Sequence, residues 1–290
     1  TAVWYRYDGS NNIVQTSRYS SGSWSTPANL SASGQSASSP QVAVDGSGNV
    51  TAVWYRYDGS NNIVQTSRYS SGSWSTPANL SASGQSAYAP QVAVDGSGNV
   101  TAVWYRSDGS NNIVQTSRYS SGSWSSSTTN LSSIVQSDFN PLPGVLKKLK
   151  ILPHDSPYPQ VVVDGSGDVT VVWARTASAT TIQTSRYSSG SWSTPADLSA
   201  SGQNAYEPQL AVDKSGNVTA VWTRSDGSKD IVQASRYHKG GWYVENAANG
   251  GTSGGDGSKT SPMLYLSDAV TASSSGDTIY IGAGTHTYTS

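Results

Sequence analysis

One 50-residue segment, Thr51–Val100, is repeated along most of the chain. The preceding 50 residues differ from it only at positions 38 and 39, and diverged copies follow it. The corresponding tryptophans are Trp4, Trp54, Trp104, Trp173 and Trp222, which lie 50, 50, 69 and 49 residues apart. An internal period of this length predicts a solenoid, a propeller or an array of similar units.

Each repeat contains four short stretches with the composition of β-strands. In the second copy and the residues before it, strands a, b, c and d are expected at Pro40–Asp45, Val50–Tyr57, Ile63–Tyr69 and Ser73–Pro77. Segments rich in Gly, Ser and Asn separate them, as in hairpins. Four antiparallel strands in about 50 residues match a propeller blade. The sequence therefore predicts an all-β fold, a β-propeller of about five four-stranded blades.

Aromatic residues carry most of the apolar surface of this chain. There are ten Trp and 17 Tyr but only one Phe. Each buried aromatic side chain removes roughly 150–250 Å² from water, so few residues can still form a core. We expect the two tryptophans of each repeat, on strands b and d, to pack between neighbouring blades.

The hairpin between strands c and d carries a motif, Ser67–Trp74, with the sequence Ser-Arg-Tyr-Ser-Ser-Gly-Ser-Trp. It returns at Ser17–Trp24, Ser117–Trp124 and Ser185–Trp192, and in looser form at Ser235–Trp242. The motif resembles a degenerate Asp box of sialidase-like propellers, without the Asp and with the Gly displaced by one position. In that family the box joins the third and fourth strands and lies away from the active face. The resemblance therefore implies the propeller fold and does not imply catalysis.

The number of strands is uneven. Strands b, c and d occur five times, whereas strand a occurs four times, at Pro40, Pro90, Pro159 and Pro208. The first blade lacks its innermost strand, so either the C-terminal segment supplies it or the ring is incomplete. We expect residues 1–245 to form the propeller, with an insertion at about 126–157, and residues 246–290 to form a separate tail or ring-closing strands.

The tail has two interpretations. Its order is a Tyr-Val strand, a Gly- and Asn-rich loop, a helix beginning at Ser261-Pro262 and a strand at Gly276–Ile281. This order resembles the N-terminal cap of pectate-lyase-like right-handed β-helices, which implies a cap and first rung without the catalytic rungs. Alternatively, Ser261–Asp268 supplies the missing strand a, with Leu264 and Leu266 as its core residues, and Gly276–Ile281 adds a further strand b.

The insertion contains the only Leu- and Lys-rich part of the chain. Val145, Leu146, Leu149 and Leu152 have helical spacing on one face. This segment is either a lid or docking element, or a decorated surface loop.

Charge and cysteine content exclude several classes of function. The net charge is −1 and charged residues make up 12% of the chain, so no basic surface for nucleic acid is expected. No apolar run approaches the ~18 residues of a membrane span, so no membrane insertion is expected. The absence of cysteine excludes disulfides and thiolate metal sites.

No cofactor or metal is expected. The repeated Asp-Gly-Ser-Gly-Asn at Asp45 and Asp95 (Asp-Gly-Ser-Gly-Asp at Asp164) lacks the oxygen spacing and terminal Glu of an EF-hand loop. An Asx-type turn that satisfies its own backbone explains it better.

The repeats also argue against an enzyme. A sialidase-type site needs distinct acid and base groups whose pKa values are pushed apart. Here Glu207 and Glu245 are the only glutamates, and the arginines of strands b and c recur at equivalent positions in every repeat. Near-identical blades carry the same side chains at equivalent positions, so they do not provide such a pair of distinct groups.

Identical blades instead favour multivalent binding. The loops between strands b and c and the segments between strands d and a are expected to share one rim, where aromatic faces and polar tips suit sugars. The predicted ligand-binding residues are Tyr7, Asp8, Tyr57, Asp58, Asn62, Tyr88, Asp108, Tyr206 and Asp226. The predicted function is a non-enzymatic module that binds carbohydrate or protein on a secreted or cell-surface protein. The alternatives are an accessory propeller of a polysaccharide-acting β-helix enzyme, or a purely structural repeat.

Overall fold

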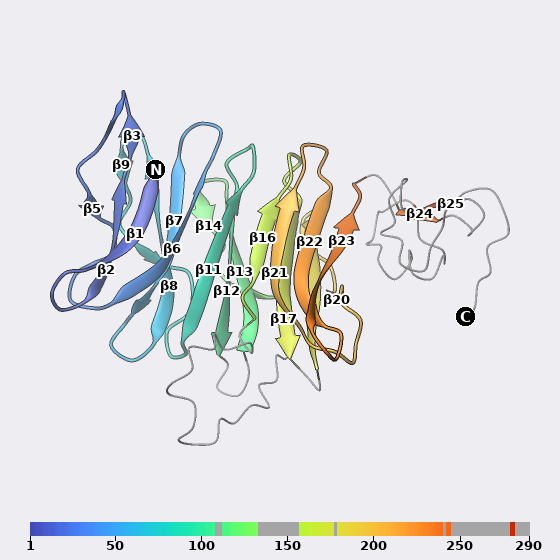
Figure 1. The fold of residues 1–290 in the computed structure, drawn as a ribbon. Helices are drawn as coiled ribbons and strands as arrows, with labels where there is room; N and C mark the ends of the chain where they lie inside the picture. The colour runs from blue at the N-terminus through green and yellow to red at the C-terminus, as the bar shows by residue number, and fades with distance from the viewer. Residues whose placement is uncertain (108–111, 133–156, 177–178, 240–241, 245–278, 282–290) are drawn as a thin grey trace, which may run out of the picture.

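A computed structural model describes residues 1–107, 112–132, 157–176, 179–239, 242–244 and 279–281. These residues form strands and turns, with no helix among them. Five antiparallel sheets, one for each repeat, lie side by side in a row, with the first and the last at opposite ends (Figure 1). The described part of the chain is thus all-β and built from repeated blades, as the sequence predicts.

The strands follow the repeats. Sheet 1 consists of β1 (Ala2–Tyr7), β2 (Asn12–Ser17) and β5 (Ala28–Asn29), with the hairpin β3 (Tyr19–Ser20) and β4 (Ser23–Trp24). Sheet 2 consists of β6 (Ala37–Val44), β7 (Val50–Tyr57), β8 (Asn62–Ser70), β9 (Ser73–Trp74) and β10 (Ala78–Asn79). Sheet 3 consists of β11 (Ala87–Val94), β12 (Val100–Ser107), β13 (Asn112–Ser120), β14 (Ser123–Trp124) and β15 (Thr129–Asn130). Sheet 4 consists of β16 (Gln160–Val163), β17 (Val169–Thr176), β18 (Thr180–Ser188), β19 (Ser191–Trp192) and β20 (Ala196–Asp197). Sheet 5 consists of β21 (Ala205–Val212), β22 (Val218–Ser225) and β23 (Asp230–Tyr237).

In sheets 2, 3 and 5, strand a begins three residues earlier than expected. In sheet 2 it starts at Ala37, and its pairing with β7 shifts register between Ser38 and Gln41. Pro40 lies in this bulge, where its missing N–H removes no ladder hydrogen bond. The residue before the proline has a positive φ in all four copies, at Ser39, Ala89, Tyr158 and Glu207. The positive φ thus recurs in all four copies, and the register shift accompanies it in sheets 2, 3 and 5.

Strand d consists of two short pieces instead of one. In sheet 2, β9 and β10 both pair with β8. Pro77 lies between them and, without an N–H, cannot continue the ladder. The outer edge of each central blade is thus made of a tight hairpin followed by a separate two-residue strand.

The core lies between the sheets. Val14 and Leu30 of sheet 1 cluster with Ala52 and Trp54 of sheet 2. The same cluster recurs between sheets 2 and 3, 3 and 4, and 4 and 5. Its strand-b tryptophans are almost fully buried: Trp54, Trp104, Trp173 and Trp222. This confirms the expected packing of the strand-b tryptophans between blades.

The strand-d tryptophans differ from that expectation. Trp74, Trp124 and Trp192 each pack against an inter-sheet cluster but remain partly exposed. Trp24 is 56% exposed, because no sheet precedes sheet 1 in the described structure. Strand d is the outermost strand of each blade, so its tryptophan has one face against the core and one toward solvent.

A second set of contacts joins the outer parts of neighbouring sheets. Each strand-c arginine places its guanidinium over a tyrosine ring of the next sheet, 3.4–4.2 Å from the ring centroid. The pairs are Arg18–Tyr69, Arg68–Tyr119, Arg118–Tyr187 and Arg186–Tyr237. Cation–π contacts of this kind contribute about 0.5–2 kcal/mol each, depending on how far they are removed from water.

Among the described residues sheet 1 has no strand a, so β1 pairs only with β2. At the other end of the chain, β24 (Trp242–Val244) pairs in parallel with β25 (Ile279–Ile281). The helix expected between them, Leu264 and Leu266, and the insertion residues Val145, Leu146, Leu149 and Leu152 lie outside the described residues. Both interpretations of the tail, and the two interpretations of the insertion, stay predictions.

Candidate ligand-binding grooves

The loops of the blades gather at two ends. We call one end the rim; it holds the b–c loops, such as residues 58–61, and the first residues of each strand a. We call the other the hairpin end; it holds the a–b turns, such as residues 45–49, and the c–d hairpins, such as residues 70–73. Because the strands pair antiparallel, the rim and the hairpin end lie at opposite ends of the strands in each sheet.

The rim brings together the two kinds of loop that the sequence placed there. The Tyr57 backbone N–H donates to the Ser36 carbonyl at 2.8 Å. The Asn62 backbone N–H donates to Ser86 Oγ at 3.2 Å. Each d–a segment thus lies against the b–c loop of its own repeat and of the next.

The carboxylates of the rim aspartates accept hydrogen bonds from the backbone of their own loops. Oδ1 of Asp8, Asp58 and Asp226 each accepts two backbone N–H groups from residues two and three positions ahead. These backbone hydrogen bonds hold the pKa of all three carboxyl groups below the usual value. The arrangement is that of an Asx turn. Asp108, the fourth predicted member of this set, lies outside the described residues.

The predicted rim tyrosines differ in exposure. Tyr7 and Tyr57 are 63% and 42% exposed. Tyr88 and Tyr206 are partly buried. The Tyr88 ring lies 5.5 Å from the ring of Tyr55 and 5.6 Å from that of Tyr105, so it belongs to an aromatic stack that spans sheets 2 and 3.

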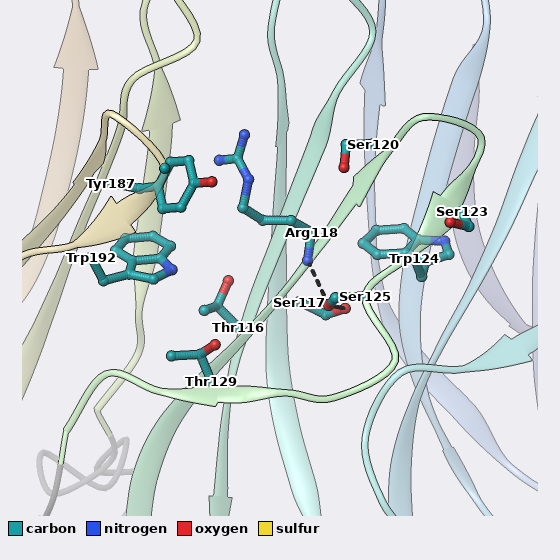
Figure 2. Close-up of a pocket in the computed structure, with 11 residues that line it drawn as sticks. Thr116, Ser117, Arg118, Ser120, Ser123, Trp124, Ser125, Thr129, Tyr187 and Trp192 are labelled. Carbon is teal, nitrogen blue, oxygen red and sulfur yellow. Dashed lines mark hydrogen bonds between the residues drawn. The ribbon is translucent and has the colours of Figure 1, made fainter.

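The hairpin end contains a groove of about 340 Å³ between sheets 3 and 4. Figure 2 shows Tyr187 and Trp192 on one side, Trp124 on the other and Arg118 between them. The hydroxyl groups that line it come from Thr116, Ser117, Ser120, Ser123, Ser125 and Thr129. Its volume falls within the roughly 300–1,000 Å³ of small-molecule sites.

Arg118 is held in place from several directions. Its Nη1 donates to Thr101 Oγ1 at 3.0 Å, and its backbone N–H donates to Ser125 Oγ at 3.3 Å. The guanidinium lies 4.0 Å from the centroid of the Tyr187 ring. Partial burial lowers the pKa of Arg118, while Tyr187 and Asp95 oppose this shift. The groove therefore presents a fixed cation between aromatic rings.

A second groove, of about 320 Å³, lies between sheets 2 and 3. It contains Arg68 and Tyr119, the equivalent stacked pair, together with Asp45 and Asn49 of the preceding a–b turn. Arg68 Nη2 lies 3.7 Å from Asp45 Oδ2. The stacked arginine–tyrosine pair thus lines a groove at both junctions, although the other walls of this second groove come from a–b turns and a c–d hairpin and include no tryptophan.

The a–b turns at this end behave as the Asx-turn interpretation predicts. Asp45 Oδ1 accepts the backbone N–H groups of Ser47 and Asn49 at 3.0 and 2.9 Å. Asp45 Oδ2 accepts from Asn49 Nδ2 at 2.9 Å. Within the described ranges, no three His, Cys, Asp or Glu side chains lie close enough together to hold a metal ion.

We expect the turn at Asp45 to make the fold sensitive to acid. Burial raises the pKa of Asp45, but hydrogen bonds from Asn49 and Ser47 outweigh it, so the pKa lies below the usual value. A group with a lowered folded-state pKa stabilises the fold above its unfolded pKa of about 3.9, and this contribution is lost as pH falls through the folded value. The thermal midpoint should therefore fall as the pH drops below about 4. Asp45→Asn should make that fall shallower; parallel curves for the two proteins would contradict the assignment.

The junction between sheets 4 and 5 has a different charge pattern. Asp168 stands where the earlier turns have Asn49 and Asn99, so two carboxylates, Asp164 and Asp168, lie together. Lys239 Nζ lies 2.7 Å from Asp164 Oδ2 and 3.2 Å from Asp168 Oδ2. Burial lowers the pKa of Lys239, but these two carboxylates outweigh it and raise the pKa overall. The added lysine balances the added carboxylate.

The sequence predicts a structural role for the c–d motif and a ligand site on the rim. The Arg and Tyr of Ser-Arg-Tyr-Ser-Ser-Gly-Ser-Trp line both grooves of the hairpin end, and its Trp lines the groove between sheets 3 and 4. A sign was present in the sequence, because each repeat keeps an arginine, a tyrosine and a tryptophan within eight residues. The contact partner of each arginine lies in the next repeat, which spacing alone does not reveal.

Comparison with known proteins identifies the fold. No family model matches the sequence, and no curated protein matches it. A structure of ulvan lyase, a polysaccharide lyase of family PL25, has a TM-score of 0.50 and 9% identity, over 79% of this chain and 60% of that chain. An α-L-arabinofuranosidase of family GH93 from Fusarium graminearum has a TM-score of 0.43 and 11% identity, over 68% of this chain and 60% of that chain. The Aleuria aurantia lectin has a TM-score of 0.40 and 13% identity, over 78% of this chain and 72% of that chain.

This chain thus spans 60% of the length of the lyase and of the arabinofuranosidase chains. At such low identity the similarity concerns the fold alone. Together with the five repeated antiparallel sheets, it identifies the chain as a protein with the all-β, β-propeller type of fold.

Proposed function

We propose that this chain is a multivalent carbohydrate-binding module without catalytic activity, and that its ligands occupy the grooves of the hairpin end. One observation carries the proposal. In the groove between sheets 3 and 4, Arg118 lies between the aromatic rings of Trp124, Tyr187 and Trp192 and is surrounded by Ser and Thr hydroxyl groups.

This set of groups matches the chemistry of a sugar. Sugar rings have apolar C–H faces, which stack on aromatic rings, and hydroxyl groups at their edges, which exchange hydrogen bonds with polar side chains. A pocket with apolar walls and a few placed polar groups is the usual form of a small-molecule site. Arg118 adds donors whose direction is fixed by its contacts with Thr101 and Tyr187.

Binding is favoured over catalysis because both grooves contain the same arginine–tyrosine pair. Arg68 and Tyr119 at one junction correspond to Arg118 and Tyr187 at the next. A hydrolase or lyase site needs groups with different protonation states at one place. Equivalent weak sites in a row instead suit simultaneous engagement of a repetitive ligand.

A module of this kind fits a secreted or cell-surface protein. The ulvan lyase that shares the fold was solved bound to -[GlcA(1-4)Rha3S]-, a fragment with an acidic and a sulfated sugar. That ligand belongs to the lyase and adds no residue to this proposal. The rim residues Tyr57 and Asp58 remain a second predicted location, which the experiment below includes.

The test is a glycan array with the purified 290-residue chain and two matched variants. The groove variant replaces with Leu the aromatic residues Trp124 and Trp192 of the groove between sheets 3 and 4 and Tyr119 of the groove between sheets 2 and 3, which keeps an apolar side chain at each position but removes the aromatic face. The rim variant replaces Tyr7 and Tyr57 with Leu. Near-UV circular dichroism confirms that both are folded.

We expect the wild-type chain and the rim variant to bind the same glycans, and the groove variant to lose them. Loss in the rim variant alone would overturn the groove assignment and return the site to the rim. A blank array with a folded wild-type chain would overturn carbohydrate binding itself.

A further inference from the structure

Each of sheets 1 to 4 buries one face against the next sheet along the chain. In the described structure, no sheet covers the equivalent face of sheet 5. On sheets 1 to 4 this face carries Val14, Val64, Val114 and Ile182, each 0% exposed beneath the next sheet. The equivalent residue on sheet 5 is Val232, which is 79% exposed. An exposed apolar face of this kind marks an interaction surface more often than an isolated surface residue does.

Sheet 1 presents the complementary face at the opposite end of the row (Figure 1). Trp24 is 56% exposed and Tyr19 is 58% exposed. Trp4 is partly exposed, whereas its equivalent Trp54 is 0% exposed against sheet 1. These are the side chains that, in later repeats, pack onto the preceding sheet.

The arginine–tyrosine stacks also leave one unpaired member at each end of the row in the described structure. In the series of arginine–tyrosine stacks, Arg236 is the next arginine after Arg186, and Tyr19 is the tyrosine before Tyr69. Arg236 is 40% exposed and contacts Asp213 Oδ2 at 2.8 Å. In the described part of the chain, no guanidinium is found over Tyr19. One half of a stack therefore lies at each end of the row.

We propose that the exposed face of sheet 5 binds the exposed face of sheet 1 of a second copy of this chain. Val232 then meets Trp4, and Arg236 stacks on Tyr19, in the geometry that the chain already uses between consecutive sheets. The occupant is a second copy because the two faces of one chain lie at opposite ends of the row. Such a head-to-tail contact is heterologous, so it extends into a chain of copies or closes into a ring of copies. It places the hairpin-end grooves of several copies in series, and it does not depend on what those grooves bind.

The first test is the molar mass in solution across a range of concentrations, measured by analytical ultracentrifugation. We expect the mass of the wild-type chain to rise above that of one copy as concentration increases. Val232→Lys should keep the chain monomeric. The matched control is Val44→Lys, because Val44 is also exposed, at 50%, but lies on strand a of sheet 2. A wild-type chain that stays monomeric at every concentration overturns the proposal, as does a loss of association in both variants.

The second test distinguishes a second copy from closure of one chain on itself. The chain contains no cysteine, so introduced thiols react alone. Chains carrying Tyr19→Cys are mixed with chains carrying Arg236→Cys and treated with a short bismaleimide. We expect a cross-linked pair from the mixture and none from either variant alone. A chain carrying both substitutions that cross-links within itself at high dilution, with no product from the mixture, overturns the proposal.

Discussion

Replacement of Trp104 with alanine should lower the free energy of unfolding by about 3–5 kcal/mol. Trp104 is 0% exposed and packs against Val53, Val64 and Leu80 of the preceding sheet. Its Nε1 also donates to Gln115 Oε1 at 3.2 Å. Alanine removes the contacts on both sides of the junction and leaves a cavity that two rigid sheets cannot easily close. Urea unfolding followed by tryptophan fluorescence and circular dichroism measures the change.

The matched control is Trp24→Ala. Trp24 is 56% exposed on the outer face of sheet 1, so its loss should change the free energy of unfolding by less than about 1 kcal/mol. Both variants are compared at concentrations where the chain is a single copy. Equal losses would mean that burial between sheets is not what holds the blades together.

Loss of the stacking faces should abolish avidity for a repetitive glycan. Binding at several grooves at once can raise the apparent affinity by about 10²–10⁴-fold over a single site. We expect substitutions of Tyr119, Trp124 and Trp192 to Leu, added one at a time, to lower the affinity for a polymeric glycan stepwise over that range. The affinity of each remaining site for the free sugar should stay the same, and only the number of sites should fall. Surface plasmon resonance with immobilised polymer and with soluble sugar separates the two effects.

The rim variant with Tyr7 and Tyr57 replaced by Leu serves as the control for this series. Its affinity for the polymer should equal that of the wild-type chain. A single substitution that removes all binding would contradict the multivalent arrangement, because the other grooves would still be intact.

Much of the fold could be predicted from the sequence because the repeat is so regular. Strands b and c were predicted almost to the residue: Val50–Tyr57 is the observed β7, and the predicted Ile63–Tyr69 lies within β8. Alternating β-branched and aromatic residues with Gly- and Asn-rich turns make such strands easy to locate. The burial of the strand-b tryptophans followed from the same pattern.

The edges of each blade were predicted less well. Strand a begins at Ala37 because the bulge before Pro40 continues the pairing, and the positive φ of Ser39 has no mark in the sequence. Strand d breaks into β9 and β10 because Pro77 interrupts its ladder. Both differences come from local backbone geometry that residue composition does not record.

The candidate site shows where sequence reasoning stops. The mixture of Tyr, Asp and Asn in the sequence favours the rim as the ligand site. In the structure, however, one carboxylate oxygen of Asp58 already accepts two backbone hydrogen bonds from its own turn. The grooves arise because Arg118 reaches across a junction to Tyr187, 69 positions along the chain. A repeat reveals which residues recur, and the stacking of sheets decides which of them meet.

The most direct test of the account is the stoichiometry of sugar binding. Isothermal titration calorimetry of the wild-type chain with the free sugar selected on the array gives the number of sites per chain. We predict more than one site per chain with similar affinities, since the junctions between sheets 2 and 3 and between sheets 3 and 4 both contain a groove. The groove variant should show correspondingly fewer sites. The same number of sites in the wild-type chain and the groove variant, or no binding by the wild-type chain, would contradict the account.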